Sequence, residues 1–323
     1  MTEIILHIGT PKTGTTAIQS AIVANSDALQ AADIWFVESG RHRAAHNDLA
    51  NSIRRKGGDH NFNEALQQEI AAQAAKRPNG KILLSSEIFS LIEASKIRAA
   101  LPFLSDYPLK IIVYLRRQDR YAEAFFKQRI KNGRNVMPFD QFLTSRLGRS
   151  ITDYNRLLDG WADCFPQAEI MPRLYQRDRF VNGDIMADFA ALLGLEPGHL
   201  VASAAERNIS PSKDVIDVLL ALSPHLDGRQ LRSIYRALKP LQLDGFTGSG
   251  DLFTRQTRQD YLDQFLAAND QLQKAYFPND GPLFSPDDPN RDKPLTSGFS
   301  PVQQTLLAAA LNEAFKLHQK TTD

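Results

Sequence analysis

The sequence predicts an α/β fold in which a central parallel sheet of about five strands is flanked by helices, with a helical C-terminal portion. Two observations lead to this prediction. Short apolar runs recur without alternation of polar and apolar residues, as in strands buried on both faces of a parallel sheet. Between these runs, apolar residues return at helical spacing. We expect one domain over 1–323, with an α/β core in 1–205 and a helical part in 206–323.

Five apolar runs are predicted to be the strands. They are Ile4–Ile8, Ile34–Val37, Lys81–Leu84, Leu109–Leu115 and Glu169–Tyr175. The run Leu109–Leu115 gives the strongest signal because it is long and rich in β-branched residues. The last run contains Pro172, which cannot donate a ladder hydrogen bond, so this strand is expected nearer an edge of the sheet.

Helical spacing and helix propensity indicate the segments between and after the strands. These are Thr15–Val23, Asn63–Lys76, Ile92–Leu104 with an expected interruption at Pro102, Arg120–Lys131, Asp153–Trp161, Gly183–Leu193 and Pro301–His318. Residues 38–61 are polar and predict a loop with one short helix near Leu49–Ile53. Further loops are expected at 244–250 and 278–292.

Composition excludes several classes of protein. The net charge of +1 over 323 residues gives no global field for nucleic acid or an anionic membrane. The single cysteine, Cys164, excludes an intramolecular disulfide and a cysteine-built metal site. The sequence contains no run of about 18 apolar residues, so no membrane span is predicted. The N-terminus lacks a signal pattern. We therefore expect a cytoplasmic protein that binds no nucleic acid.

The loop between the first strand and the first helix carries the strongest chemical signal. It reads Gly9-Thr10-Pro11-Lys12-Thr13-Gly14 and is followed by Thr15-Thr16. The unpaired N–H groups and the positive dipole end of a helix favour an anion at such a place. Lys12 adds a cation and the threonines add hydroxyl donors, so a phosphate is the simplest ligand.

The order of these residues decides which phosphate ligand is expected. A Walker loop has lysine directly after its second glycine, but Thr15 stands there and the lysine precedes Gly14 by two residues. The pattern Pro11-Lys12-Thr13-Gly14-Thr15-Thr16 after a strand resembles the 5′-phosphosulfate loop of sulfotransferases that use 3′-phosphoadenosine 5′-phosphosulfate (PAPS). The resemblance implies a P-loop-NTPase-like sheet, a loop that holds the 5′-phosphate, and a Lys12 that contacts the oxygen bridging phosphate and sulfate.

The second signature of that family is an arginine at a strand end, followed about eight residues later by a serine, both contacting the 3′-phosphate. Arg116 ends the run Leu109–Leu115 and fits the arginine. Ala124 stands at the serine position, which removes one donor. Arg117, Arg120 or Lys127 are the candidates to compensate for it.

A general base is expected after the third strand. Glu87 follows Ser85-Ser86 there, where the family places its base, and the branch that sulfates carbohydrate amines uses glutamate. The alternative is structural: a serine caps the following helix, with Glu87 near its positive end. His46 is the alternative base, and His7, inside a strand, is more typical of a packed residue.

Two weaker candidates complete the site. Tyr175 ends the fifth strand, where the family often has a tyrosine near the adenine, although packing explains it equally well. Arg207 lies in a predicted loop and could add to the nucleotide pocket. Because ligands of parallel sheets lie at the carboxyl ends of strands, Gly9, Glu87 and Arg116 are expected in one crevice.

The resemblance implies a PAPS-dependent sulfotransferase that needs no metal. It would move a sulfuryl group to a hydroxyl or amine, on a carbohydrate or glycoconjugate by analogy, and release adenosine 3′,5′-bisphosphate. Residues 1–205 would bind the nucleotide, and 206–323 would cover and shape the acceptor site. Two alternatives stay open: a P-loop kinase or NTPase, and a non-catalytic nucleotide-binding protein, which the alanine at 124 keeps in view.

Overall fold

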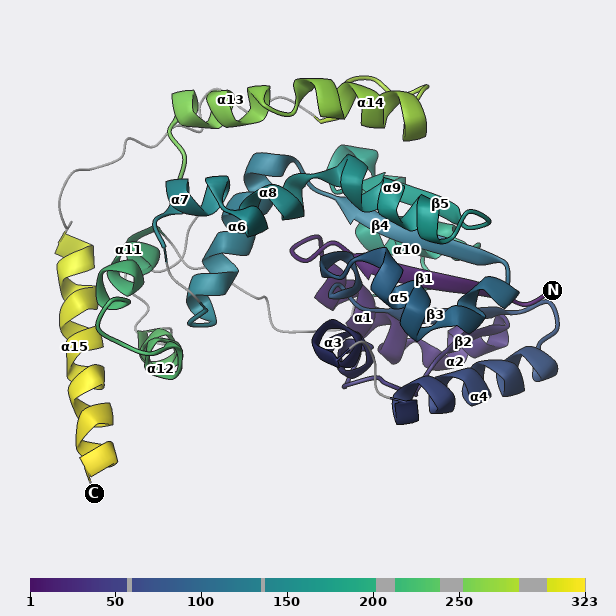
Figure 1. Ribbon diagram of the computed structural model, residues 1–323, viewed down its shortest axis with the longest axis horizontal. Helices are drawn as coiled ribbons and strands as arrows, with labels where there is room; N and C mark the ends of the chain where they lie inside the picture. The colour runs from purple at the N-terminus through teal and green to yellow at the C-terminus, as the bar shows by residue number, and fades with distance from the viewer. Residues whose placement is uncertain (57–59, 135–136, 202–212, 239–251, 285–300, 323) are drawn as a thin grey trace. The chain divides into compact units, whose positions relative to one another are not determined.

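The computed structural model describes residues 1–56, 60–134, 137–201, 213–238, 252–284 and 301–322 (Figure 1). The chain divides into two compact units. The first comprises Met1–Arg117, Asp153–Glu206 and Ala267–Phe284, and the second comprises Gln118–Thr152, Arg207–Leu266 and Ser285–Asp323. This division differs from the expected boundary at 205, because the segment 118–152 groups with the C-terminal helices and 267–284 groups with the sheet.

The first unit contains one parallel sheet of five strands in the order β2-β3-β1-β4-β5. The strands are β1 (Glu3–Gly9), β2 (Ile34–Phe36), β3 (Lys81–Ser85), β4 (Leu109–Leu115) and β5 (Glu169–Leu174). The predicted parallel α/β sheet is confirmed, and the proline-containing β5 lies at an edge as expected.

The strand order places β1 at the centre, where the chain changes direction across the sheet. From β1 the chain goes out to β2 and returns to β3, and it then crosses β1 to form β4 and β5. The carboxyl ends of the strands on both sides of such a switch point border the same edge of the sheet. The loop after β1 therefore stands between the ends of β3 and β4.

Helices cover both faces of this sheet. The helices of this unit are α1 (Thr15–Ala24), α2 (Ser26–Ala31), α3 (Asn47–Lys56), α4 (His60–Lys76), α5 (Ala94–Ala100), α9 (Tyr154–Cys164), α10 (Ile185–Leu192) and α14 (Leu266–Tyr276), the last of which is hydrogen-bonded to α9. Ile18 of α1 and Phe189 of α10 pack with Ile5 of β1 in one buried cluster. On the other face, α5 packs against α9, which contacts β5 (Figure 1).

Two predicted segments of the first unit differ from the structure. The expected short helix at 49–53 is the longer α3, because Leu49, Ala50 and Ile53 are all buried on one helical face. The helix expected at 92–104 is shorter, because α5 ends at Ala100. The expected interruption at Pro102 is found, since proline has no N–H for the helical hydrogen bond, and a 3₁₀ turn follows at Pro102–Asp106.

A buried polar network fastens α10 to the sheet. Asp188 of α10 is fully buried and accepts a 2.8 Å hydrogen bond from the Tyr114 hydroxyl of β4. The Arg173 guanidinium of β5 pairs with the same carboxylate, with Nε 3.2 Å from Oδ2. Burial raises the pKa of Tyr114 well above its usual value, so its hydroxyl stays a donor. Removing one partner of a buried charged network of this kind costs about 3–5 kcal/mol.

The second unit is helical in the residues that the structure describes, as predicted for the C-terminal portion. It contains α6 (Gln118–Lys131), α7 (Phe139–Thr144), α8 (Arg146–Thr152), α11 (Lys213–Leu222), α12 (Gly228–Leu238), α13 (Arg255–Asp263) and α15 (Pro301–Thr322). Phe126 of α6 contacts Phe139 and Phe142, and Phe139 contacts Phe253. This aromatic contact set explains why 118–152 belongs with the C-terminal helices.

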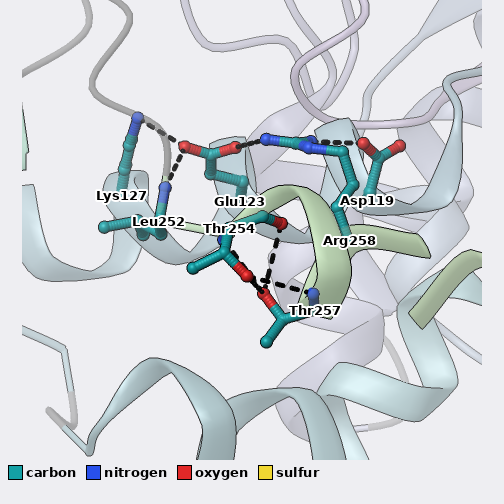
Figure 2. Close-up of polar contacts among 7 residues, drawn as sticks. All are labelled: Asp119, Glu123, Lys127, Leu252, Thr254, Thr257 and Arg258. Atoms are coloured by element: carbon teal, nitrogen blue, oxygen red, sulfur yellow. Dashed lines mark hydrogen bonds and ion pairs between the residues drawn. The ribbon is translucent and has the colours of Figure 1, made fainter. Parts of the chain in front are cut away.

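Charged side chains also join α6 to α13 (Figure 2). Glu123 accepts from the Lys127 ammonium at 2.8 Å and from the Leu252 amide at 3.0 Å, while Arg258 of α13 pairs with Asp119. The fully buried Asp119 carboxylate is thereby neutralised by Arg258. Lys127, suggested above as a compensating phosphate ligand, thus has its ammonium paired with a carboxylate of its own helix.

Among the described helices, none is long and apolar enough to cross a membrane.

Candidate functional site

The loop after β1 is held in shape by its own threonines. The Thr10 hydroxyl donates to the Tyr114 carbonyl at 3.0 Å, and the Thr13 hydroxyl donates to the Thr10 carbonyl at 2.5 Å. Thr13 is fully buried, so its hydroxyl braces the loop. Lys12 has φ +68° and Gly14 has φ +74°. The left-handed turn at these two positions lets the chain pass from β1 into α1 within five residues, Thr10 to Gly14.

The first turn of α1 is suited to an anion. Gly14 is the N-cap, no side chain caps the helix, and no acidic residue lies in the first turn. Thr15 is buried and Thr16 is exposed, so the Thr16 hydroxyl is the one that faces solvent here. Backbone N–H groups at a helix start, together with the helix dipole, favour a phosphate at this position.

Gly14 is closely surrounded. A Cβ added to it would lie 2.8 Å from Cδ1 of Ile185 and 3.4 Å from Cε2 of Tyr175. A side chain at this position would displace the Ile185 methyl and would be strained at φ +74°. Tyr175, predicted from its place after the fifth strand, thus lies against the loop, with Ile185 of α10 beside it.

Arg116 joins the end of β4 to the same loop. Its Nη1 donates to the Lys12 carbonyl at 3.0 Å, and its guanidinium carbon lies 5.7 Å from the centre of the Tyr175 ring. The backbone of Arg116 is held in turn, because its carbonyl accepts from the Tyr154 hydroxyl. Residues from the ends of β1, β4 and β5 therefore meet at one edge of the sheet, as expected from the parallel topology.

Glu87 lies at the base of the loop, two residues after β3. A Cβ added to Gly9 would lie 3.0 Å from the Glu87 Cα, so a glycine is required for this approach. The Glu87 carboxylate accepts from the Gln19 amide at 3.0 Å. No serine caps α5, which begins only at Ala94. The Ser86 hydroxyl instead accepts from the Ile88 amide at 3.2 Å, where the chain enters a 3₁₀ turn at Phe89–Leu91.

The two histidines considered as bases are buried. His46 is 0% exposed, and its Nδ1 accepts from the Ser85 amide at 3.1 Å. Burial lowers the pKa of His46 to about 4 and that of His7 to about 3. Both are neutral at pH 7 and enclosed in the first unit. Glu87, which is partly exposed, is therefore better placed than His46 to take a proton from a substrate.

These histidines predict a pH dependence of stability. Their ordinary pKa of 6.5 is lowered in the folded chain to about 3 for His7 and about 4 for His46, so below pH 6.5 the unfolded chain binds more protons. The free energy of unfolding is therefore expected to fall as pH drops from about 6.5 toward 4, by up to about 1.4 kcal/mol per pH unit for each histidine. Urea unfolding of wild type and His46→Gln at several pH values measures the slope. An equal slope in both proteins between pH 6.5 and 5 would contradict this prediction.

The structure thus brings together most of the residues singled out in the sequence. Arg116 contacts both the Lys12 carbonyl and the Tyr175 ring, and Tyr175 lies against Gly14. Glu87 adjoins Gly9 at the start of the loop. Arg207 lies outside the described residues.

Sequence reasoning missed three residues that position the others. They are Gln19, Tyr154 and Ile185. Gln19 left a signal, because it is a polar residue next to Ile18 on the apolar face of the first helix. Tyr154 and Ile185 left none, since an apolar or aromatic residue at the start of a helix is ordinary. Among the described residues, no group of three or more His, Cys, Asp or Glu side chains could hold a metal ion.

Comparison with known proteins adds little to this geometry. No family model matches the chain. A protein of Archaeoglobus fulgidus described as uncharacterized is 31% identical over 206 residues, which is 61% of this chain and 54% of that protein. The match therefore spans about half the length of that relative.

A solved structure is also similar. It is the crystal structure of a sulfotransferase from Alicyclobacillus acidocaldarius, with a TM-score of 0.38 and 16% identity, covering 63% of this chain and 85% of that chain. A likeness of this strength carries no functional argument, so the functional conclusion depends on the site itself.

Proposed function

We propose that this protein is a sulfotransferase that uses PAPS as donor and a hydroxyl or amine as acceptor. One observation carries the proposal. Arg116, 104 residues from Lys12 in sequence, donates a hydrogen bond to the Lys12 carbonyl. The two motifs that resemble the nucleotide-binding signatures of this family therefore support each other at one edge of the sheet.

The residues at this edge fit a nucleotide with phosphates at two positions. The uncapped first turn of α1 and the Thr16 hydroxyl suit the 5′-phosphate. Arg116 supplies a guanidinium suited to the 3′-phosphate. Tyr175 offers an aromatic ring beside Arg116, and a ring in this position suits the adenine or its ribose.

PAPS would supply the sulfuryl group, and the chain would supply positioning and charge. Lys12 would stabilise the negative charge that develops on the phosphate oxygen as the sulfuryl group departs. Glu87 would accept the proton of the acceptor hydroxyl or amine as its new bond to sulfur forms. The loop and the base stand at the ends of adjacent strands, β1 and β3, which favours the alignment that an in-line transfer needs. A carbohydrate is the acceptor class to test first.

A nucleotide titration tests the donor site. Adenosine 3′,5′-bisphosphate is expected to bind at least about tenfold more tightly than 5′-AMP, a difference of roughly 1.4 kcal/mol, in buffer without added metal. Arg116→Ala is expected to reduce this preference to about twofold or less, because the 3′-phosphate loses its cation. Isothermal titration calorimetry with the two nucleotides and ATP gives the three affinities.

The matched control for this titration is Arg156→Ala, which removes an exposed arginine of α9 in the same unit. It should leave the preference unchanged. Tighter binding of ATP than of the bisphosphate by the wild-type protein would contradict the proposal and favour a kinase or NTPase.

A further inference from the structure

The geometry points to Gln19 as a positioning residue that, supported by Ser85 and His7, holds the Glu87 carboxylate in its orientation for proton transfer. This inference rests on the function proposed above and adds a residue to it. Gln19 lies on α1 and is 5% exposed. A polar side chain at that depth is retained when its groups are hydrogen-bonded.

A chain of hydrogen bonds runs from Glu87 into the core. The Gln19 amide nitrogen lies 3.0 Å from Oε2 of Glu87 and 3.3 Å from Oγ of Ser85. Oγ of Ser85 lies 2.8 Å from Nδ1 of His7. These residues come from α1, β3 and β1, which are rigid elements of one packed unit. Side chains held in this way keep a single orientation.

The donors and acceptors in this chain have one consistent order. A carboxylate only accepts, so the Gln19 amide presents its nitrogen to Glu87, and its two N–H groups serve Glu87 and Ser85. The Ser85 hydroxyl, having accepted from Gln19, then has its own proton to donate. Among the contacts of the described residues, Nδ1 of His7 is the acceptor at hydrogen-bond distance. In this order the neutral His7 ring carries its proton on Nε2.

The state of His7 supports this order. His7 is fully buried, and burial lowers its pKa to about 3, so that at pH 7 the ring is neutral and one nitrogen can accept. Its Nε2 has no hydrogen-bond partner among the described residues. A buried polar atom without a partner is unfavourable for stability. The imidazole offsets this cost by accepting a hydrogen bond at Nδ1, which orients Ser85 and, through Ser85, Gln19.

The position of Gln19 on α1 also connects the base to the anion site. The helix that begins at Gly14 and Thr15 carries Gln19 one turn further along, and residues four apart lie on the same helical face. The same rigid helix therefore presents its first turn to the phosphate and its side chain to Glu87. The distance between donor site and base is thereby set by one element, as an in-line transfer requires.

The experiment compares Gln19→Met with the control Gln67→Met, which makes the same change at an exposed position of α4. Gln19→Met is expected to lower kcat about 10- to 100-fold, the range found when a hydrogen-bonded partner that orients a metal ligand is removed. The affinity for adenosine 3′,5′-bisphosphate should stay within about twofold of wild type. Ser85→Ala is expected to give a smaller loss in the same direction.

A double-mutant cycle shows whether Gln19 acts through Glu87. In a Glu87→Gln background, adding Gln19→Met is expected to change kcat less than about twofold, because residues that act as a unit are not additive. An equal loss in both backgrounds, or a parallel loss of bisphosphate affinity, would overturn the inference and indicate a purely structural role. Wild-type kcat in Gln19→Met would overturn it as well.

An NMR measurement separates failure of this inference from failure of the proposed function. The side-chain NH₂ signals of Gln19, assigned by their absence in Gln19→Met, should shift in both Glu87→Gln and Ser85→Ala. If they shift while the wild-type protein transfers no sulfuryl group, the hydrogen-bond chain exists but the proposed function is wrong. If they do not shift in an active protein, the inference alone is wrong.

Discussion

Glu87→Gln is expected to lower kcat for sulfuryl transfer by about 10²–10⁴-fold, the typical contribution of a general base. In transition-state free energy this is roughly 3–5 kcal/mol. The substitution keeps the size of the side chain and leaves an amide oxygen that can still accept from Gln19. The ability to take up a proton and the negative charge are removed while the shape of the side chain is kept, so the structure of the loop beside Gly9 should be preserved.

The measurement is the rate at which adenosine 3′,5′-bisphosphate forms from PAPS in the presence of an acceptor, with bisphosphate affinity determined in parallel. Affinity should be unchanged, because in the proposed mechanism Glu87 contacts the acceptor and not the nucleotide. Glu64→Gln, at an exposed position of α4, is the matched control. A kcat within about threefold of wild type in Glu87→Gln would show that Glu87 is not the general base. The next variant to test would then be His46→Gln.

Lys12→Met is expected to lower kcat by about 10²–10³-fold, or roughly 3–4 kcal/mol, because a positioned donor to the developing charge is lost. Methionine is chosen because it keeps an unbranched side chain of similar length. At φ +68° it meets the same backbone strain as lysine, whereas glycine would relieve that strain and change two properties at once. The hydrogen bond from Arg116 to the backbone carbonyl of residue 12 is available in both proteins.

The division between kcat and KM decides what Lys12 contributes. A loss in kcat with little change in KM for PAPS means that the ammonium acts mainly in the transition state. A higher KM with unchanged kcat would contradict this role and make Lys12 an ordinary phosphate ligand. Lys96→Met, which removes an exposed cation from α5, controls for the change in net charge.

Much of the local structure could be predicted from the sequence, and particular residues show why. The run Leu109–Leu115 is apolar without alternation except at Lys110, and a strand covered on both faces buries all of its apolar side chains. An inner strand uses its N–H groups to pair with a neighbour on each side, and Pro172 has no N–H. Its strand was therefore expected, and is found, at an edge of the sheet. Gly14 predicts a tight turn into a helix, because glycine readily adopts the left-handed conformation found there.

The arrangement of the candidate site was only partly accessible. That Glu87 and Arg116 follow strands, and so lie at the same edge of a parallel sheet, follows from topology. The burial of His46, which accepts a hydrogen bond from the Ser85 amide, could not be predicted from topology. A histidine in a polar stretch has the same local sequence pattern whether it is exposed or buried. The role of Gln19 depends on a contact with a residue 68 positions away.

The sequence by itself determined which segments are strands and which loop suits an anion. It also determined which polar residues follow the strands and so lie at the same edge of the sheet. These features depend on neighbours within a few residues, where propensity and periodicity act. Tertiary structure alone decided the strand order, the grouping of 118–152 with the C-terminal helices, and the hydrogen bonds that orient Arg116 and Glu87. The physical reason is that five similar apolar runs satisfy the same local rules in many orders, and only the packing of distant side chains distinguishes among them.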